Sequence, residues 1–303
     1  MGAGENGGGT DVMKVMVTTL LGLVGFLAAL TSTLTPKKSG GASQWLACPT
    51  DNPSKRAWEV FNLFYSGVWV GCFAVIISLG LYERFDELAY MVVCGGLSLP
   101  IFLFPVLWPA KVDARLPLTE RFAARANLWM AVYSFIGNYW YTHYFYSVLG
   151  AKYTFPSWRL NDVPIPLYFA TFFYFSMYHV FSNAAIRRVV TGYEPGAARL
   201  AMLVALVGVM SYVTAFMETL TISGFPYYSF EDRDMAYKLG SAFYGIYFIV
   251  SFPAFYAFDE WPKKHGVSTL WETTVNSMGA GMLILTLLDL VRLAVGVPLT
   301  VKG

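Results

Sequence analysis

The stretch VFNLFYSGVWVGCFAVIISLGL, residues 60–81, contains no Asp, Glu, Lys or Arg. A helix needs about 20 mostly apolar residues to cross the hydrocarbon core of a bilayer. Seven other stretches of the 303-residue chain have a similar length and character. The eight stretches are Val12–Leu34, Val60–Leu81, Leu88–Trp108, Leu128–Leu149, Ile165–Ala185, Leu200–Ile222, Leu239–Phe258 and Thr274–Val297. The sequence therefore predicts an all-α, polytopic membrane bundle with about eight spanning helices.

The amino-acid composition also indicates a membrane protein. Hydrophobic residues make up 56% of the chain and charged residues only 13%, whereas soluble domains carry about 25% charged residues. The net charge is +2, without the clustered basic face of a nucleic-acid-binding protein. Cys48, Cys72 and Cys94 lack the spacing of a metal site. We therefore expect the lipid bilayer as a partner, and neither nucleic acid nor a bound metal.

The chain divides into two expected parts. Residues 1–44 combine a Gly-rich tail with one anchor helix, and residues 45–303 form a transmembrane catalytic bundle. A targeting segment is the alternative interpretation of the first helix. The loops between the predicted helices are too short for a soluble domain, so we expect the functional site inside the bundle or at its rim.

Positive charge predicts the orientation. Most of the 21 Lys and Arg residues lie in alternate loops, at 35–59, 109–127, 186–199 and 259–270. Loops rich in Lys and Arg face the cytosol. We therefore expect these four loops in the cytosol and both chain ends on the opposite side of the membrane.

Ionisable side chains within spanning helices are costly and point to function. Five occur in the predicted helices: His143, His179, Glu218, Asp289 and Arg292. At about 1.5 Å per residue, the first, third and fourth lie within roughly 6–12 Å of the same membrane face. Glu218 has no basic residue three or four positions away, which favours a neutral acid. Asp289 and Arg292 are three residues apart and can pair with each other.

Other polar and aromatic side chains accompany this layer. His179 and Asn183 share one helix face nearer the cytosolic end, either as an interhelical hydrogen-bond clamp or as a ligand contact. Tyr139 and Trp140 lie too deep for an interfacial aromatic belt alone. Their rings are suited to a pocket in which π faces stabilise a cation.

Several motifs occur in consistent order between Trp45 and Val297. They are Asn52-Pro-Ser-Lys-Arg, Ala126-Asn-Leu-Trp, Gly137-Asn-Tyr-Trp-Tyr-Thr-His-Tyr-Phe-Tyr, Thr154-Phe-Pro-Ser-Trp, Asn161-Asp-Val-Pro, Tyr178-His-Val-Phe-Ser-Asn, Glu218-Thr with Phe225-Pro-Tyr-Tyr, Tyr247-Phe-Ile-Val-Ser-Phe-Pro, Asp259-Glu260 and Leu288-Asp-Leu-Val-Arg-Leu. In these motifs the chain resembles the cycloeucalenol cycloisomerase family of plants and algae. The resemblance implies a seven-helix core, here with one added amino-terminal helix. It also implies an endoplasmic-reticulum enzyme that opens the cyclopropane ring of cycloeucalenol to give obtusifoliol without cofactor or metal.

The chemistry of this ring opening suggests roles for the membrane-embedded residues. A proton must reach the strained methylene bridge, a tertiary cation must be stabilised, and a neighbouring ring proton must leave. We expect Glu218 to donate the proton, His143 to act as base or proton shuttle, and Asp289 to stabilise the cation. The expected substrate contacts are Tyr139, Trp140, His179, Asn183, Tyr227 and Tyr228.

Two other functions remain open at this point. A double-bond-shifting sterol isomerase of the emopamil-binding type needs similar acid and base groups. A non-enzymatic sterol binder or transporter would need the pocket but not the acid. The sequence does not indicate an oligomeric state.

Overall fold

The computed structural model describes residues 8–37, 43–142, 146, 150–223, 225–229, 240–261 and 266–296. The main helices are α1 (Gly8–Thr31), α2 (Pro53–Ser78), α3 (Glu87–Leu107), α4 (Phe122–Ile136), α6 (Ile165–Gly192), α7 (Ala197–Ser223), α9 (Ser241–Ala257) and α10 (Leu270–Val295). Each overlaps one of the eight stretches expected to be helical. The described part of the chain therefore confirms an all-α membrane bundle.

Short elements connect the helices. The 3-10 helices η1 (Leu81–Arg84) and η2 (Leu118–Glu120) lie in loops, and the π-helix η3 (Gly137–Tyr141) continues α4. Strand β1 (Lys152–Tyr153) pairs antiparallel with β4 (Tyr228–Ser229), and β2 (Arg159–Leu160) pairs antiparallel with β3 (Val163–Pro164). The strands are two residues long, so each pair only joins two loop segments by backbone hydrogen bonds and does not form an extended sheet.

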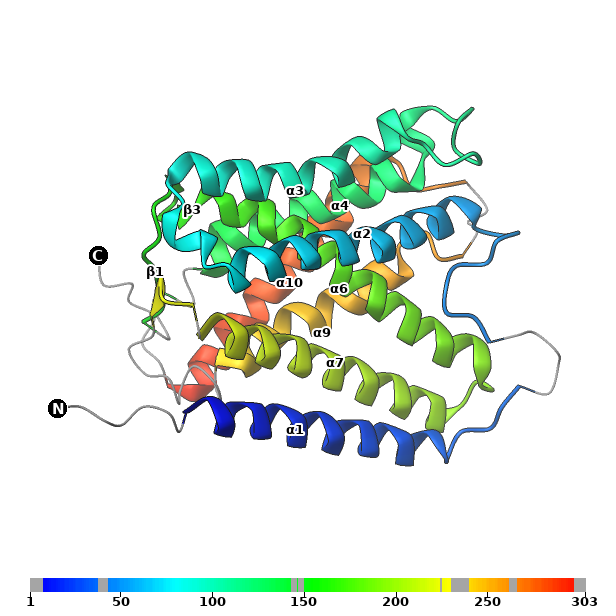
Figure 1. Ribbon diagram of the computed structural model, residues 1–303. Helices are drawn as coiled ribbons and strands as arrows, with labels where there is room; N and C mark the ends of the chain where they lie inside the picture. The colour runs from blue at the N-terminus through cyan, green and yellow to red at the C-terminus, as the bar shows by residue number, and fades with distance from the viewer. Residues whose placement is uncertain are drawn as a thin grey trace.

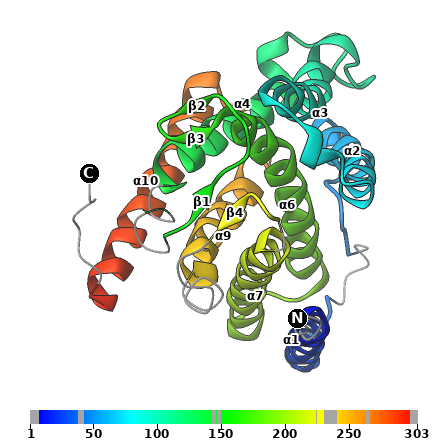
Figure 2. The ribbon, with the colours of Figure 1, turned by 60° about the vertical axis from the view of Figure 1, so that its left-hand side comes forward.

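Helix α6 lies at the centre of the bundle (Figures 1 and 2). It contacts α2, α3, α4, α7 and α9. Helix α10 packs against α4 and α9, and α1 packs along α7 at the edge of the bundle. Helix α1 begins and α10 ends at the same end of the bundle (Figure 1), an arrangement that agrees with the expected placement of both chain ends on one side.

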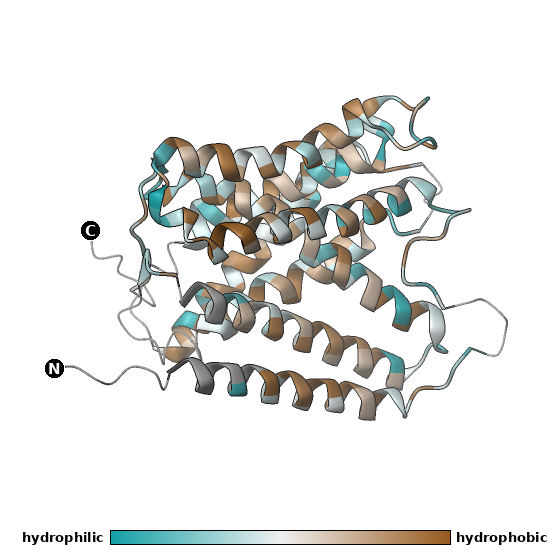
Figure 3. Ribbon diagram, viewed as in Figure 1, coloured by the Kyte–Doolittle hydropathy of each residue, from teal (hydrophilic) through white to brown (hydrophobic). Residues whose placement is uncertain are grey.

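Hydropathy separates outer helices from central ones. Helices α2, α3, α7 and α10 contain segments long and apolar enough to cross a membrane, and Val17–Thr31 and Ser241–Ala257 are shorter apolar helices. Figure 3 shows hydrophobic residues along α1, α2, α3 and α7. Helices α4 and α6 are more polar, but most of α4 and half of α6 are buried by their neighbours. Polar side chains are tolerated there because they face protein and not lipid.

The amino-terminal helix is attached to the bundle by its carboxyl end. Leu34, just after α1, is buried, and the Lys37 ammonium donates a hydrogen bond to the carbonyl of Val190 at 3.1 Å. Pro36 forms an isolated β-bridge with Tyr193. These contacts join α1 to the turn between α6 and α7. The division of the chain into residues 1–44 and 45–303 stays a prediction.

Helix α2 begins earlier than its apolar run predicted, at Pro53 and not near Val60. Asn52 caps the helix, because its side chain accepts the backbone N–H of Lys55, and proline is favoured at the first helical position. The additional two turns carry Lys55 and Glu59, which hydropathy assigned to a loop. Both side chains are fully buried.

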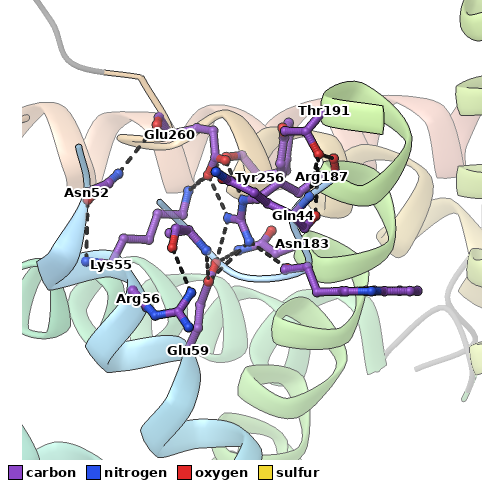
Figure 4. A network of polar contacts seen from close by, with 12 residues as sticks. Gln44, Asn52, Lys55, Arg56, Glu59, Asn183, Arg187, Thr191, Tyr256 and Glu260 are labelled. Atoms are coloured by element: carbon purple, nitrogen blue, oxygen red, sulfur yellow. Dashed lines mark hydrogen bonds and ion pairs between the residues drawn. The ribbon is translucent and has the colours of Figure 1, made fainter. Parts of the chain in front are cut away.

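Four charged side chains, Lys55, Glu59, Arg187 and Glu260, form a buried charged network at one end of the bundle (Figure 4). Arg187 Nη2 lies 2.7 Å from Glu59 Oε1, and Arg187 Nε lies 2.6 Å from Glu260 Oε1. Lys55 Nζ lies 2.8 Å from Glu260 Oε2. The network joins α2, α6 and the loop after α9, and its two positive and two negative charges balance.

A neighbouring ion pair fixes the same loop. Arg125 on α4 lies 2.9 Å from Asp259 Oδ2, and Ser268 donates its hydroxyl to Asp259 Oδ1 at 2.7 Å. Asp259 adopts a left-handed backbone conformation (φ 48°), which is unfavourable for a residue with a side chain. Lys55 also donates to the carbonyls of Tyr256 and Phe258 at 2.9 and 2.8 Å. These bonds fix the loop in this conformation.

The charged network predicts a large loss of stability when its central cation is removed. We expect Arg187→Met to lower the free energy of unfolding by about 3–5 kcal/mol, because two carboxylates are left buried without their shared partner. Thermal unfolding of the detergent-solubilised protein measures this. Arg115→Met, at an exposed position, is the matched control. Equal unfolding temperatures for the two variants would contradict the role given to the network.

The same network predicts an acid-sensitive fold. Burial raises the pKa of Glu260, but hydrogen bonds and charges from Arg187 and Lys55 outweigh it and hold the pKa below its ordinary value of 4.5. A carboxyl with a depressed pKa in the folded state stabilises the fold above its unfolded pKa, and this stability is lost as the pH falls through the folded pKa. We expect the unfolding temperature to drop as the pH falls below about 4.5, and Glu260→Gln to flatten that dependence. An unchanged slope in the variant would argue against Glu260 as its source.

Candidate functional site

Glu218 lies near the carboxyl end of α7, where α6, α7 and α9 contact one another. Its Oε2 accepts two hydrogen bonds from tyrosine hydroxyls. Tyr244 of α9 donates at 2.8 Å, and Tyr178 of α6 donates at 3.2 Å. Two neutral O–H donors from different helices therefore fix the carboxyl group and stabilise negative charge on it.

On one side of Glu218 lies an apolar pocket of about 400 Å³. Its walls come from α2, α3 and α6 and include Trp69, Phe73, Phe173 and Cys94. Tyr174, Tyr178 and Glu218 provide polar atoms at one part of the wall. A pocket of this size, mostly apolar and with a few convergent polar groups, is typical of a small-molecule site.

On another side of Glu218 lies a smaller cavity of about 60 Å³, which we call the polar cavity because amide, hydroxyl and carboxyl groups contribute to its wall. Asn138 of η3, Thr171 of α6 and Thr219 of α7 line it, with Tyr244 of α9. Glu218, Tyr153, Leu167 and Tyr174 line both the polar cavity and the apolar pocket. The carboxyl group therefore lies at the boundary between an apolar and a polar compartment.

The β1–β4 strand pair and the π-helix η3 both lie beside Glu218. The strand pair places Tyr153 opposite Tyr228, and their rings lie 4.4 Å apart beside Glu218. At the end of α4 the backbone widens into the π-helix η3, which places Gly137 and Asn138 at the polar cavity. Single π-helical turns often occur at functional sites.

Three of the expected substrate contacts take different positions at this end of the bundle. Tyr228 is buried and lines the polar cavity. Tyr139 stacks on Phe135, Trp140 meets Phe135 edge to face, and Trp140 is 46% exposed. These last two are absent from the lining of both compartments. Of the three, the structure therefore brings only Tyr228 to Glu218.

Tyr227 packs against two residues of the apolar pocket without lining it. Its ring lies 5.5 Å from the ring of Phe225 and 6.4 Å from that of Tyr82, and both of those rings line the pocket. Tyr227 therefore contacts the pocket wall but is not part of it.

His179 and Asn183 lie deeper in the protein core. His179 is fully buried, with Nδ1 2.7 Å from the carbonyl oxygen of Phe175 and Nε2 3.0 Å from Ser251 Oγ on α9. Asn183 donates to Glu59 Oε1 at 3.5 Å, next to the charged network. Neither lines the apolar pocket or the polar cavity. Their contacts are those of the interhelical clamp that the sequence left open as an alternative.

The two residues expected to act with Glu218 are placed differently. His143 lies outside the described residues. Asp289 is exposed on α10, and Arg292 on the same helix is buried. Asp289 does not line either compartment. The catalytic roles of His143 and Asp289 stay predictions.

Sequence reasoning missed the hydrogen-bonding partners of Glu218. Tyr178 and Tyr244 were not singled out as site residues, nor were Asn138 and Thr171. A weak signal existed, because Tyr174 and Tyr178 are four residues apart and so share one face of α6. The four-residue spacing shows that the two tyrosines share a face, but it does not predict that this face turns toward α7.

No group of three or more His, Cys, Asp or Glu side chains in the described part of the chain is arranged to hold a metal ion. The absence of a metal or cofactor from the reaction stays a prediction.

Comparison with known proteins identifies the family. No family model matches the chain, and no solved structure matches it. The chain is 43% identical over 261 residues to the cycloeucalenol cycloisomerase of Arabidopsis thaliana, a match that covers 85% of this chain and 91% of that relative. This confirms the resemblance found in the motifs. The chain belongs to the cycloeucalenol cycloisomerase family.

Proposed function

We propose that this protein is a sterol isomerase of the endoplasmic-reticulum membrane, which opens the cyclopropane ring of cycloeucalenol to give obtusifoliol. The name and the high identity of the Arabidopsis relative support the reaction. The observation that carries the mechanism is the position of Glu218, whose carboxyl group reaches an apolar pocket while two tyrosine hydroxyls hold it.

The apolar pocket fits the substrate by size and chemistry. Its volume of about 400 Å³ and its aromatic and aliphatic walls suit a rigid hydrocarbon skeleton. Ile77 of α2 lines the pocket and is 62% exposed on the outer surface of the bundle. We therefore propose that a sterol enters the pocket from the bilayer near Ile77.

The polar groups orient the sterol. Tyr174, Tyr178 and Glu218 lie together on the pocket wall. The sterol hydroxyl and the cyclopropane bridge both belong to the ring-A end of the skeleton, so this end faces Glu218. The alkyl side chain then lies toward Trp69 and Phe73, among apolar side chains.

The reaction begins with proton transfer from the Glu218 carboxyl group to the methylene bridge. One carbon–carbon bond of the cyclopropane breaks, the bridge becomes the angular methyl group, and a tertiary cation forms at the ring junction. The hydroxyls of Tyr178 and Tyr244 stabilise the new carboxylate, since both donate to Oε2. Carboxylate charge and nearby aromatic faces stabilise the cation.

The reaction ends with loss of a neighbouring ring proton, which leaves a double bond. His143 is the proposed acceptor or shuttle for this proton. The sequence of steps adds one proton and removes one, so the sterol is neither oxidised nor reduced. Glu218 must regain a proton before the next turnover.

Glu218→Gln tests the proposed acid. We expect conversion of cycloeucalenol to fall by at least about 10²-fold, because an amide keeps the shape of the side chain but does not deliver the proton. Sterol products are measured with purified, detergent-solubilised protein. In deuterated water the wild-type product should carry one deuterium in the new angular methyl group.

Glu87→Gln is the matched control, because Glu87 is an exposed carboxyl in the first turn of α3. Its activity should equal that of the wild type. Full activity of Glu218→Gln would remove Glu218 from the mechanism. Sterol that binds to the wild-type protein and is recovered unchanged would favour a binding protein instead.

Ala170→Leu tests the position of the sterol. Ala170 of α6 is buried and lines the apolar pocket, so a larger side chain narrows it. We expect KM for the sterol to rise about tenfold with a smaller change in kcat. The larger side chain weakens binding of the sterol, whereas kcat describes the chemical step after the sterol has bound. Ala201→Leu, at an exposed position of α7, is the control. An unchanged KM in Ala170→Leu would place the sterol elsewhere.

A further inference from the structure

The polar cavity beside Glu218 has the properties of a water site. Its volume of about 60 Å³ exceeds the roughly 10–15 Å³ that one water molecule requires. Thr171, Thr219 and Asn138 contribute polar groups to its wall. A bound water needs two to four polar partners, and this wall can provide them.

Asn138 provides an independent indication of a ligand in the cavity. The side chain is only 5% exposed and lines the cavity. Its amide nitrogen donates to the carbonyl of Ser134 at 2.8 Å and to the hydroxyl of Thr171. Its Oδ1 takes part in none of the hydrogen bonds found for Asn138. This oxygen is therefore available to a donor bound in the cavity.

Thr171 fixes this amide. Its hydroxyl accepts the hydrogen bond from Asn138 and donates its own proton to the carbonyl of Leu167, one turn earlier in α6. The amide plane of Asn138 is therefore held from two directions, by Ser134 on its own helix and by Thr171 on the neighbouring one. This arrangement keeps Oδ1 available to the cavity.

We propose that the polar cavity binds water, that Asn138 and Thr171 position this water, and that it returns the proton to Glu218 after each ring opening. This inference rests on the proposed function, because it assigns the regeneration of the same acid. Asn138 and Thr171 are positioning residues, since they act through the water and not on the sterol.

The proton balance of this step closes without another reactant. After the sterol has taken the proton, the Glu218 carboxylate accepts a proton from the cavity water. In the same step the water takes up the proton that His143 has removed from the sterol ring, so no hydroxide is left and the number of protons is unchanged. No electrons are transferred, and the protein returns to its starting state.

Thr171→Val tests the water site, because it replaces the hydroxyl with a methyl group of similar size. We expect kcat to fall about tenfold with KM for the sterol changed less than about twofold. The solvent isotope effect on kcat in deuterated water should rise, because return of the proton becomes rate-limiting. Thr171→Ser keeps the hydroxyl and should restore both values.

Ser176→Ala is the matched control. Ser176 is a buried hydroxyl on the same helix, and it donates to the carbonyl four residues earlier, as Thr171 does, but it does not line the cavity. We expect its kcat and isotope effect to equal those of the wild type. If Thr171→Val unfolds at a lower temperature, Asn138→Leu provides a second test with the same expected result.

The outcomes separate this inference from the proposed function. An unchanged kcat and isotope effect in Thr171→Val and Asn138→Leu would overturn the water site, as would equal losses in Thr171→Val and Ser176→Ala. If Glu218→Gln is inactive in the same experiment, the proposed function stands without the water site. An active Glu218→Gln would instead remove the acid that the water serves.

Discussion

Arg187 carries its charge where water does not reach it, and an isolated ion in such a place would cost far more than the fold can supply. Glu59 of α2 and Glu260 after α9 both bond to this one guanidinium. Lys55 balances the second carboxylate. Three segments that are distant in the sequence must therefore meet at one point, at one end of the bundle.

The other end of the bundle meets a different requirement. The tyrosine donors to Glu218 are neutral, whereas the donors to Glu59 and Glu260 include cations. A cation partner fixes a carboxylate in its ionised form, while a neutral hydroxyl remains a suitable neighbour when the carboxyl gains or loses a proton. The charged network thus joins α2, α6 and the loop after α9 at one end of the bundle, while the pocket beside Glu218 lies at the other end.

Hydropathy predicted the helices well, because the cost of exposing backbone to lipid imposes long apolar runs. It failed at the start of α2, where capping by Asn52 extends the helix into charged residues. Glu218 was predictable as an acid within an apolar helix. Tyr178 and Tyr244 were not, because their meeting depends on how α6 and α9 rotate against α7. Trp140 belongs to the π-helix η3 and lies exposed; a widened turn changes which side chains face inward, and a simple helical count misses this.

A reaction that passes through a carbocation must exclude water from the sterol, because water would add to the cation and give an alcohol. The same reaction must return a proton to its acid, and water is a suitable carrier. These requirements conflict if the acid faces a single compartment. Glu218 borders a mostly apolar pocket and a separate polar cavity. Glu218 and Tyr174 line both of them. Proton return from the cavity can therefore occur without wetting the cation, and this separation gives the boundary position of Glu218 a chemical reason.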